Sequence, residues 1–253
     1  MVALVGCGDP ESLLVTGDVE NDVYSGESGG GYGPTSTNPS DYGSIVGTVK
    51  FEGKPYARKM ETLSDKFCIN ARPDGMVSEE FLFDPATGGL QNVFVYIARG
   101  MQRVKFDVPS EPVILDQVGC QYIPHAAILR VGQPLRIKSS DNTLHNVAAT
   151  PRNNDAFNKT MNTPSVLPDM VFGRGEPDPI KIRCDVHGWM KSYVAILSHP
   201  FCAITPQDGS FSLKDVPPGS YKLVYWHEYM GKKEMDITIE NNKELKLELV
   251  FER

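Results

Sequence analysis

Short segments in which apolar and polar residues alternate recur along most of the chain after Ser44. In the segment 45–51 (IVGTVKF), a period of two places Ile45, Val49 and Phe51 on one face, as expected for a half-buried strand. Many short strands at regular spacing are typical of β-sandwich modules. The same pattern predicts further strands over 91–98, 112–116, 127–131, 133–138, 145–149, 180–184, 192–197, 210–213, 221–227, 234–239 and 244–251.

Helical periodicity is nearly absent from the sequence. Only the segments 57–67 and 153–161 have a pattern that a short helix could adopt. The 23 glycines and 19 prolines are too many for a helical bundle and suit turn-rich β structure. We therefore expect an all-β protein.

The charge balance argues against nucleic acid as a binding partner. Lys and Arg number 25 against 32 Asp and Glu, a formal net charge of −7, so no overall basic field favours nucleic acid. No run of 18 or more apolar residues occurs, so the sequence predicts no membrane-spanning helix. Membrane association would then depend on a lipid anchor alone.

The first residues suggest such an anchor. Residues 4–7 (LVGC) resemble the lipobox at which bacterial lipoproteins are cleaved and lipidated on cysteine, here Cys7. Six residues precede Cys7, so residues 1–7 correspond to a truncated signal, and an apolar stretch that arose by chance is the alternative. Residues 8–43, rich in Gly, Ser, Asn, Asp and Pro, are predicted to form a disordered linker. This layout predicts a protein of the periplasm or cell surface, held at a membrane.

Four residues in the second half of the chain can supply metal ligands. His145 lies far upstream of a compact C-x2-H-x2-M loop that contributes Cys184, His187 and Met190. Two imidazoles, a soft thiolate and a weak thioether are the ligand set of a trigonal blue-copper site. We therefore predict one copper ion (Cu+/Cu2+) per chain. Zinc competes for the same two histidines and cysteine.

The segment from about 112 to 198 resembles a cupredoxin, with a ligand loop similar to those of amicyanin and plastocyanin. Residues 131–138 (VGQPLRIK) are similar to the strand that leads into the first ligand histidine of cupredoxins, although Gln133 replaces the usual Asp. The resemblance implies a Greek-key β-sandwich, and a hydrogen bond from Asn146 that stiffens the ligand loop. Gly188 stands where amicyanin-type loops have proline, which predicts a softer loop.

A second resemblance covers the C-terminal tail. The turns at 208–209 (DG) and 217–219 (PPG) lie between predicted strands, as in the carboxypeptidase regulatory-like domain, a small immunoglobulin-like β-sandwich. Two further strands of that family match 47–49 (GTV) and 92–96 (NVFVY), far upstream, which implies a discontinuous sandwich with the other domain inserted in it. Two domains in sequence are the simpler alternative. The implied limits are 44–110 plus 200–253 for the regulatory-like sandwich and 111–199 for the cupredoxin domain. The combination resembles a group of exported bacterial proteins.

Four other cysteines remain besides Cys184. One of them is Cys7, and in an exported protein Cys68 and Cys120 are expected to pair as a disulfide that joins the two predicted modules. The alternative joins Cys120 to His125, and to Cys68, in a second metal or redox site. The fifth cysteine, Cys202, lies in an apolar segment and is expected to be a buried thiol.

The sequence has no motif of a hydrolase or dehydrogenase, since G-x-S-x-G, Walker A, H-E-x-x-H and G-x-G-x-x-G patterns are absent. An enzyme is therefore not expected. The ligand set predicts an extracytoplasmic mononuclear copper protein for one-electron transfer, with a redox partner such as a cytochrome or an oxidoreductase. Two alternatives stay open: a copper-binding or copper-delivery protein, and a cell-surface interaction module with a structural metal.

Overall fold

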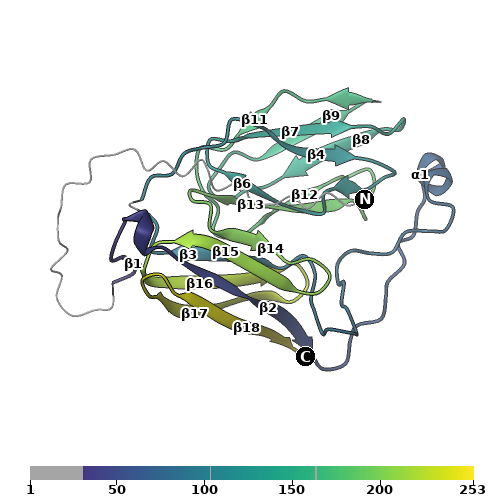
Figure 1. Ribbon diagram of the computed structural model, residues 1–253. Coiled ribbons are helices and arrows are strands. Elements are labelled where there is room, and N and C mark those ends of the chain that lie inside the picture. The colour runs from purple at the N-terminus through teal and green to yellow at the C-terminus, as the bar shows by residue number, and fades with distance from the viewer. Residues whose placement is uncertain (1–30, 103, 163) are drawn as a thin grey trace.

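A computed structural model describes residues 31–253, except 103 and 163. These residues form two β-sandwiches stacked one on the other, which we call the lower and the upper sandwich after their places in Figure 1. The prediction of an all-β protein is confirmed, with α1 (Lys66–Ala71) and the 3-10 helix η2 (Pro39–Asp41) as the helices of the described part. Cys7 and the predicted signal lie outside the described residues. No helix within the described ranges has the length and apolar character of a membrane span.

The lower sandwich consists of a sheet in the order β1-β16-β3-β14, with β17 on β16, and a facing sheet in the order β15-β2-β18. Ile45 and Val49 are fully buried and Phe51 is 4% exposed, so the face predicted from their alternation is the core face. The strands are β1 (Gly33–Pro34), β2 (Gly43–Glu52), β3 (Phe94–Arg99), β14 (Cys202–Ile204), β15 (Ser210–Val216), β16 (Gly219–His227), β17 (Gly231–Ile239) and β18 (Glu244–Glu252).

The upper sandwich consists of a sheet in the order β10-β7-β4-β5, with β11 on β7, and a facing sheet in the order β6-β13-β12-β8-β9. Buried side chains such as Leu115, Ile137 and Val194 fill the space between the two sheets. The strands are β4 (Val113–Gln117), β5 (Tyr122–Ile123), β6 (Ala126–Arg130), β7 (Pro134–Ser139), β8 (His145–Ala149), β9 (Phe157–Met161), β10 (Ser165–Val166), β11 (Met170–Val171), β12 (Ile180–Arg183) and β13 (Lys191–Leu197).

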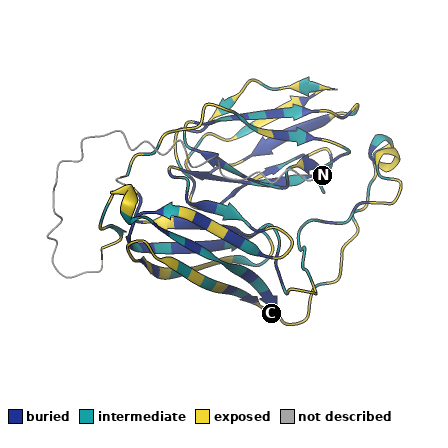
Figure 2. Cartoon of the chain, in the orientation of Figure 1, coloured by how far each residue is buried: buried dark blue, intermediate teal, exposed yellow. Residues whose placement is uncertain are grey.

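An apolar seam joins the two sandwiches. One face of β3, β14 and β16 meets one face of β6 and β13, and buried residues from both sides form a separate core cluster. The central layers are accordingly buried in Figure 2. The seam residues are Phe94, Tyr96, Ala195, Leu197, Cys202 and Val224.

The strands of the upper sandwich all lie between β3 and β14 in the sequence, and β3 and β14 are hydrogen-bonded neighbours. The chain therefore leaves the lower sandwich at the end of β3 and returns beside it. The residue limits at 110 and 200, the Greek-key connectivity and the regulatory-like assignment of the lower sandwich stay predictions.

A long connection between β2 and β3, residues 53–93, runs from the lower sandwich up the side of the upper one, and we call it the strap (Figure 1). The helix predicted over 57–67 is wrong in position, since α1 begins at Lys66. The reason is the cap: the Asp65 carboxylate accepts the backbone N–H groups of Phe67 and Cys68 and so fixes the start of the helix.

The second predicted helix, over 153–161, is not formed. Its second half is strand β9, which pairs with β8 along its whole length. Its first half bonds elsewhere, because the Asn153 and Asn154 side chains donate to the carbonyls of Gly175 and Arg174. Pairing with a neighbouring strand outweighs the weak local preference for a helix.

The predicted linker 8–43 extends too far toward the C-terminus. Within its described part, Gly33 and Pro34 pair with β16, and Asn38 caps η2 by accepting the backbone N–H of Ser40. Backbone pairing with β16 orders this segment even though it has few apolar side chains.

Candidate metal centre

Two neighbouring strands of the upper sandwich position the predicted ligands. His145 is the first residue of β8, and Cys184 directly follows β12, which pairs with β8. His187 and Met190 lie in the loop between β12 and β13. Two backbone hydrogen bonds close this loop: Cys184 donates to the Met190 carbonyl at 3.1 Å, and Met190 donates to the His187 carbonyl at 2.9 Å.

Three of the predicted donor atoms converge on one point. His145 Nδ1 and His187 Nδ1 are 2.9 Å apart, and Cys184 Sγ lies 4.0 Å from each of them. A point between the three atoms lies roughly 2 Å from each of them. This distance is close to the bond lengths from a metal such as zinc to imidazole nitrogen and thiolate sulfur. All three side chains are buried. The chemistry and spacing of this donor set therefore fit a single bound ion.

Met190, the fourth predicted ligand, is 1% exposed and belongs to the same core cluster as Cys184. The loop thus places the thioether in the apolar interior rather than toward solvent, in the core cluster that also contains Cys184. A thioether ligand to copper is weak and long.

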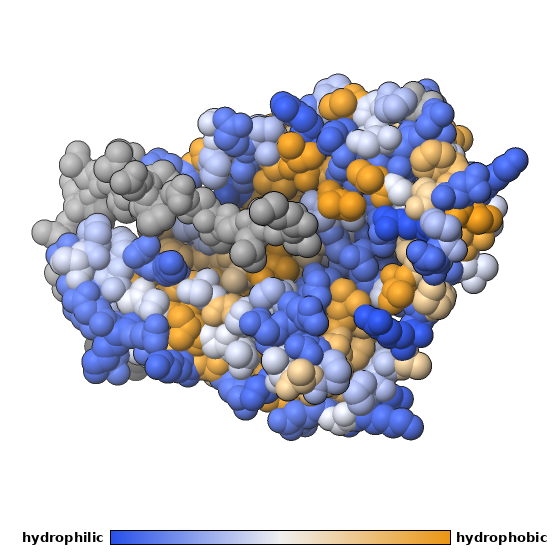
Figure 3. All heavy atoms as spheres, turned by 45° about the vertical axis from the view of Figure 1, so that its right-hand side comes forward, coloured by the Kyte–Doolittle hydropathy of each residue, from blue (hydrophilic) through white to orange (hydrophobic). Residues whose placement is uncertain are grey.

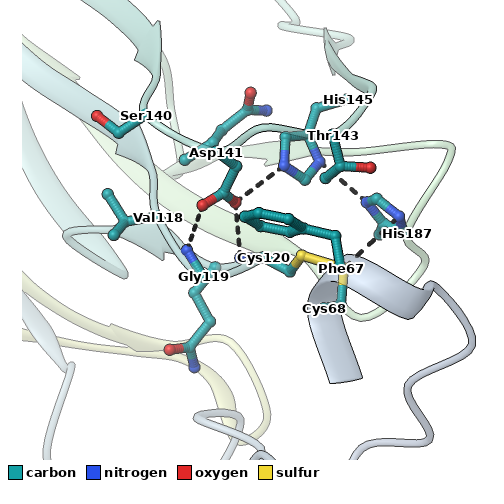
Figure 4. A network of polar contacts seen from close by, with 12 residues as sticks. Phe67, Cys68, Val118, Gly119, Cys120, Ser140, Asp141, Thr143, His145 and His187 are labelled. Atoms are coloured by element: carbon teal, nitrogen blue, oxygen red, sulfur yellow. Dashed lines mark hydrogen bonds and ion pairs between the residues drawn. A yellow bond between two sulfur atoms is a disulfide. The ribbon is translucent and has the colours of Figure 1, made fainter. Parts of the chain in front are cut away.

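Asp141 is a contributor that sequence reasoning missed. Its Oδ2 lies 3.0 Å from His145 Nε2, and its carboxylate also accepts the backbone N–H groups of Gly119 and Cys120 (Figure 4). When His145 Nε2–H donates to this carboxylate, the lone pair of Nδ1 faces the metal position. The sequence feature that could have indicated this contact is the D-x3-H spacing in 141–145 (DNTLH), which covers the short loop between β7 and β8 and the first residue of β8.

Electrostatics at the centre favour a thiolate and a neutral second histidine. Burial raises the pKa of Cys184, but the hydrogen bond to His145 and backbone N–H groups outweigh it and the net shift is downward. Burial and the charge of His145 lower the pKa of His187. Burial lowers the pKa of His145 as well, but Asp141 and Cys184 reverse this and raise it to about 9. A metal ion must displace that proton, so metal binding strengthens as the pH rises.

Asn146 connects the strand that carries His145 to the ligand loop. Its backbone N–H donates to Cys184 Sγ at 3.5 Å, and its side-chain amide donates to Asp185 and accepts the Asp185 backbone N–H. Hydrogen bonding to the loop is the contact that the resemblance implied for this residue.

Cys68 and Cys120 form a disulfide that links α1 to the upper sandwich. Cys68 Sγ lies 3.7 Å from His187 Nε2, and Asp65 Oδ2 lies 3.8 Å from the same nitrogen. Figure 4 shows the contacts running from Asp141 through His145 to His187 and on to Cys68. The strap therefore covers the outer edge of His187, which is only 2% exposed.

One aromatic neighbour, Trp189, packs beside the site. The Trp189 ring lies 5.1 Å from that of His187, centroid to centroid, and its indole N–H donates to the Cys120 carbonyl. Cys202 lies away from this site, as a buried thiol in the seam, as expected from its apolar segment.

His125 does not join Cys120 in a second site. Its Nε2 hydrogen-bonds the Glu228 carboxylate, and its Nδ1 lies 3.4 Å from Glu79. Lys191 lies 3.0 Å from Glu228 on the other side. Burial lowers the pKa of His125, but the two carboxylates raise it to about 9, so this histidine belongs to an ion cluster between the sandwiches.

No family model matches the chain, and no curated protein sequence matches it. Part of it is similar to solved copper proteins. A copper-containing nitrite reductase from Thermus scotoductus SA-01 shares 15% identity over 36% of this chain, with a TM-score of 0.31, and this chain spans only 23% of it. An oxidised variant of amicyanin shares 17% over 36% of this chain and 88% of its own, with a TM-score of 0.31. A purple cupredoxin from Nitrosopumilus maritimus shares 21% sequence identity over 33% of this chain and 98% of its own length, with a TM-score of 0.28.

These likenesses are low in identity and in TM-score, and they leave the lower sandwich unidentified. We therefore rest the metal centre on its own side chains.

Proposed function

We propose that the chain is a mononuclear copper protein that transfers single electrons. The observation that carries the proposal is the convergence of His145 Nδ1, His187 Nδ1 and Cys184 Sγ in a buried position. A copper ion held there supplies the one-electron Cu+/Cu2+ couple. The residues of the chain would hold it in a geometry that changes little between the two states.

The rigidity of the donor set supports electron transfer over simple storage. Asn146 ties β8 to the ligand loop, the two backbone hydrogen bonds close the loop, and Asp141 orients His145. Donors that are already in place need little rearrangement when the charge of the ion changes. The thiolate of Cys184 and the thioether of Met190 are soft ligands, which favours copper over zinc.

The visible absorption spectrum after addition of Cu(II) tests the proposal. We expect an intense thiolate-to-copper band that is lost in Cys184→Ser. Cys202→Ser is the matched control, because Cys202 is also a buried cysteine outside the disulfide but lies in the seam. A folded protein without the band, or a band that persists in Cys184→Ser, would contradict the proposal.

A copper-delivery role is the second candidate, and the cover over His187 is the observation that favours it. The ring edge that could face a redox partner is 2% exposed and lies against α1. Voltammetry separates the two: an electron carrier gives a reversible one-electron wave, whereas a delivery protein loses copper to a chelating acceptor without cycling.

We further propose that the protein works in the periplasm or at the cell surface, anchored by lipid on Cys7, with a cytochrome or an oxidoreductase as redox partner. The Cys68–Cys120 disulfide supports an oxidising compartment. The lower sandwich would serve as scaffold or docking module. Metabolic labelling with a fatty acid tests the anchor, since Cys7→Ser should abolish incorporation.

A further inference from the structure

The two ligand histidines each have a second ring nitrogen, and these nitrogens face a second group of donors. The Nδ1 atoms of His145 and His187 face Cys184, whereas the Nε2 atoms face the disulfide side of the site. Donor atoms of Cys68, Cys120 and His187 lie within 4.8 Å of one another, and so do donor atoms of Cys120, Asp141 and His145. The back of the metal centre is therefore itself a cluster of sulfur, nitrogen and oxygen donors.

The sulfur atoms of Cys68 and Cys120 are poor metal ligands while they are joined in the disulfide. A dithiol reductant changes this by delivering two electrons and two protons: the Cys68–Cys120 bond breaks, two thiols form, and the reductant becomes a disulfide. A soft cation then displaces both thiol protons, because thiolates are its preferred ligands.

We propose that reduction of the Cys68–Cys120 disulfide creates a second metal site, in which both thiolates and His187 Nε2 bind one Cu(I) ion. With both sites filled, the His187 ring would bridge two ions as an imidazolate, with Nδ1 toward the first site and Nε2 toward the second, so the second ion displaces the ring N–H proton as well as the two thiol protons. This site depends on the Nε2 side of the ring only, so it does not require that the first site carries electrons.

The structure allows the two sulfur atoms to separate. Cys68 sits on α1, a helix of six residues in the strap, and the outer side of that helix is open, since Ile69 is 48% exposed. Cys120 is held on the other side by contacts within the upper sandwich: its backbone N–H donates to Asp141, and Trp189 donates to its carbonyl. Arg72, at the end of α1, reaches the Gly119 carbonyl through a long side chain that can follow a small movement of the helix. A shift of α1 alone can therefore open room for an ion while the upper sandwich stays in place.

The donor set favours Cu(I) over other cations. Two thiolates and one imidazole match the low coordination number and softness of Cu(I), whereas structural zinc needs four ligands. The carboxylate of Asp65, 3.8 Å from His187 Nε2, adds negative charge beside the cation. The site is also buried, because Cys68 and Cys120 are both fully inaccessible to solvent.

The test is the number of Cu(I) ions that the full chain retains against bicinchoninate, a chromogenic Cu(I) chelator. Two samples are titrated in parallel. One is the oxidised protein; the other is reduced with a dithiol, after which the reductant is removed under anaerobic conditions. We expect one ion per oxidised chain and two per reduced chain. In the double variant Cys68→Ser, Cys120→Ser we expect one ion under both conditions, whereas Cys202→Ser should behave as the wild type.

Two results would overturn the proposal: one ion per chain in both redox states of the wild type while far-UV circular dichroism shows it folded, or two ions in the double variant. Unfolding on reduction would also overturn it, because the site needs the upper sandwich. Cys184→Ser separates this inference from the proposed function. It should lose the first ion and still gain one on reduction, so either proposal can fail alone.

Alkylation gives an independent measurement. Iodoacetamide should modify Cys68 and Cys120 in the reduced, copper-free protein, because loss of the crosslink lets α1 move and expose them. Two equivalents of Cu(I) should protect both, as measured by peptide mass spectrometry. Free modification of both cysteines in the loaded protein would contradict binding through their thiolates.

Discussion

At the scale of single residues, the candidate metal centre includes a carboxylate that holds a predicted ligand without being one of the predicted ligands itself. Asp141 accepts from His145 Nε2 and from two backbone N–H groups, so it is held in place independently of the histidine. Its charge makes the His145 ring a stronger ligand and fixes which ring nitrogen is free.

Asp141→Asn should weaken Cu(II) binding by about 10- to 100-fold, because an amide keeps the size of the side chain but removes its charge. Competition with a chelator of known affinity measures the change. Asp116→Asn is the control: Asp116 accepts from Ser140 near the same end of the sandwich and forms an ion pair with Lys138, not with a predicted ligand. Equal losses in the two variants would show that the effect is not specific to the His145 contact.

The buried cluster around Glu228 predicts a pH-dependent stability. His125 has its pKa raised from 6.5 to about 9, so the stability it contributes is complete below about pH 6.5 and is lost as the pH rises through 9. Glu228 has its pKa lowered from 4.5 to about 2 by His125 and Lys191 despite its burial, so its contribution is complete above pH 4.5 and is lost toward pH 2. The pair stabilises the fold most between these limits.

Glu228→Gln should therefore lower the unfolding free energy by about 3 kcal/mol near pH 5.5, since it leaves His125 and Lys191 buried without this carboxylate. Urea unfolding of the wild type and the variant from pH 5 to pH 10 measures the difference, which should shrink above pH 9. A difference that does not change with pH would contradict the ion pair.

The sequence was most informative about residues whose type is rare and whose spacing is tight. Cys184, His187 and Met190 fall within seven positions of one another, so their chemistry could be inferred without coordinates. Asp141 could not be inferred with the same ease, because Asp in a polar loop is ordinary turn chemistry. The pairing of His125 with Glu228 joins residues 103 positions apart and leaves no local signal.

At the scale of elements, the strap is the part that departs most from a plain double sandwich. It connects two strands of the lower sandwich but carries α1 to the metal centre of the upper one (Figure 1). Arg72, just after α1, donates to carbonyls of Val118 and Gly119, and the disulfide adds a covalent link.

Replacing both Cys68 and Cys120 by Ala should destabilise the protein by about 4 kcal/mol, the loop-closure estimate for a disulfide that spans 52 residues. Thermal unfolding of the oxidised wild type and the double variant measures the loss. Cys202→Ala is the comparison for removal of a buried sulfur without a crosslink. A loss no larger than that of Cys202→Ala would mean that the strap is held by its polar contacts alone.

Strands were predictable and the strap was not, for a physical reason. Alternation along 45–51 or 145–149 reports burial on one side of a sheet, which a local pattern encodes directly. The start of α1 depends on the Asp65 cap, and its position depends on the disulfide to Cys120, which is distant in the sequence. β9 likewise owes its extended form to β8 rather than to its own polar residues.

At the scale of the whole molecule, the seam makes two sandwiches into one body. Phe94 is 1% exposed and packs edge-on against Trp226, 5.8 Å between ring centroids, within the cluster that both sandwiches share. The outer surface is different in character: hydrophilic residues predominate on the face shown in Figure 3, with hydrophobic ones interspersed. The net charge of −7 fits such a surface.

Phe94→Ala should lower stability by about 3 to 5 kcal/mol and let the two sandwiches open separately. Amide hydrogen exchange at increasing urea concentrations measures this separation. In the wild type, β7 and β18 should lose protection at the same urea concentration, and in the variant at different concentrations. Phe211→Ala is the control, because Phe211 lies in the core of the lower sandwich alone. Simultaneous loss in Phe94→Ala would show that the seam does not couple them.

The nesting of the upper sandwich between β3 and β14 sets the order in which a growing chain can fold. The ribosome releases β2 and β3 first, yet the strands that pair with them, β14 to β16 and β18, come last. The upper sandwich is contiguous and can close meanwhile, so the nascent protein carries two unpaired strands of the kind that chaperones bind. The same order holds when a chain crosses a membrane N-terminus first: Cys68 and Cys120 reach the oxidising side before Cys184, so they can pair before the ligand thiol arrives to compete for either of them.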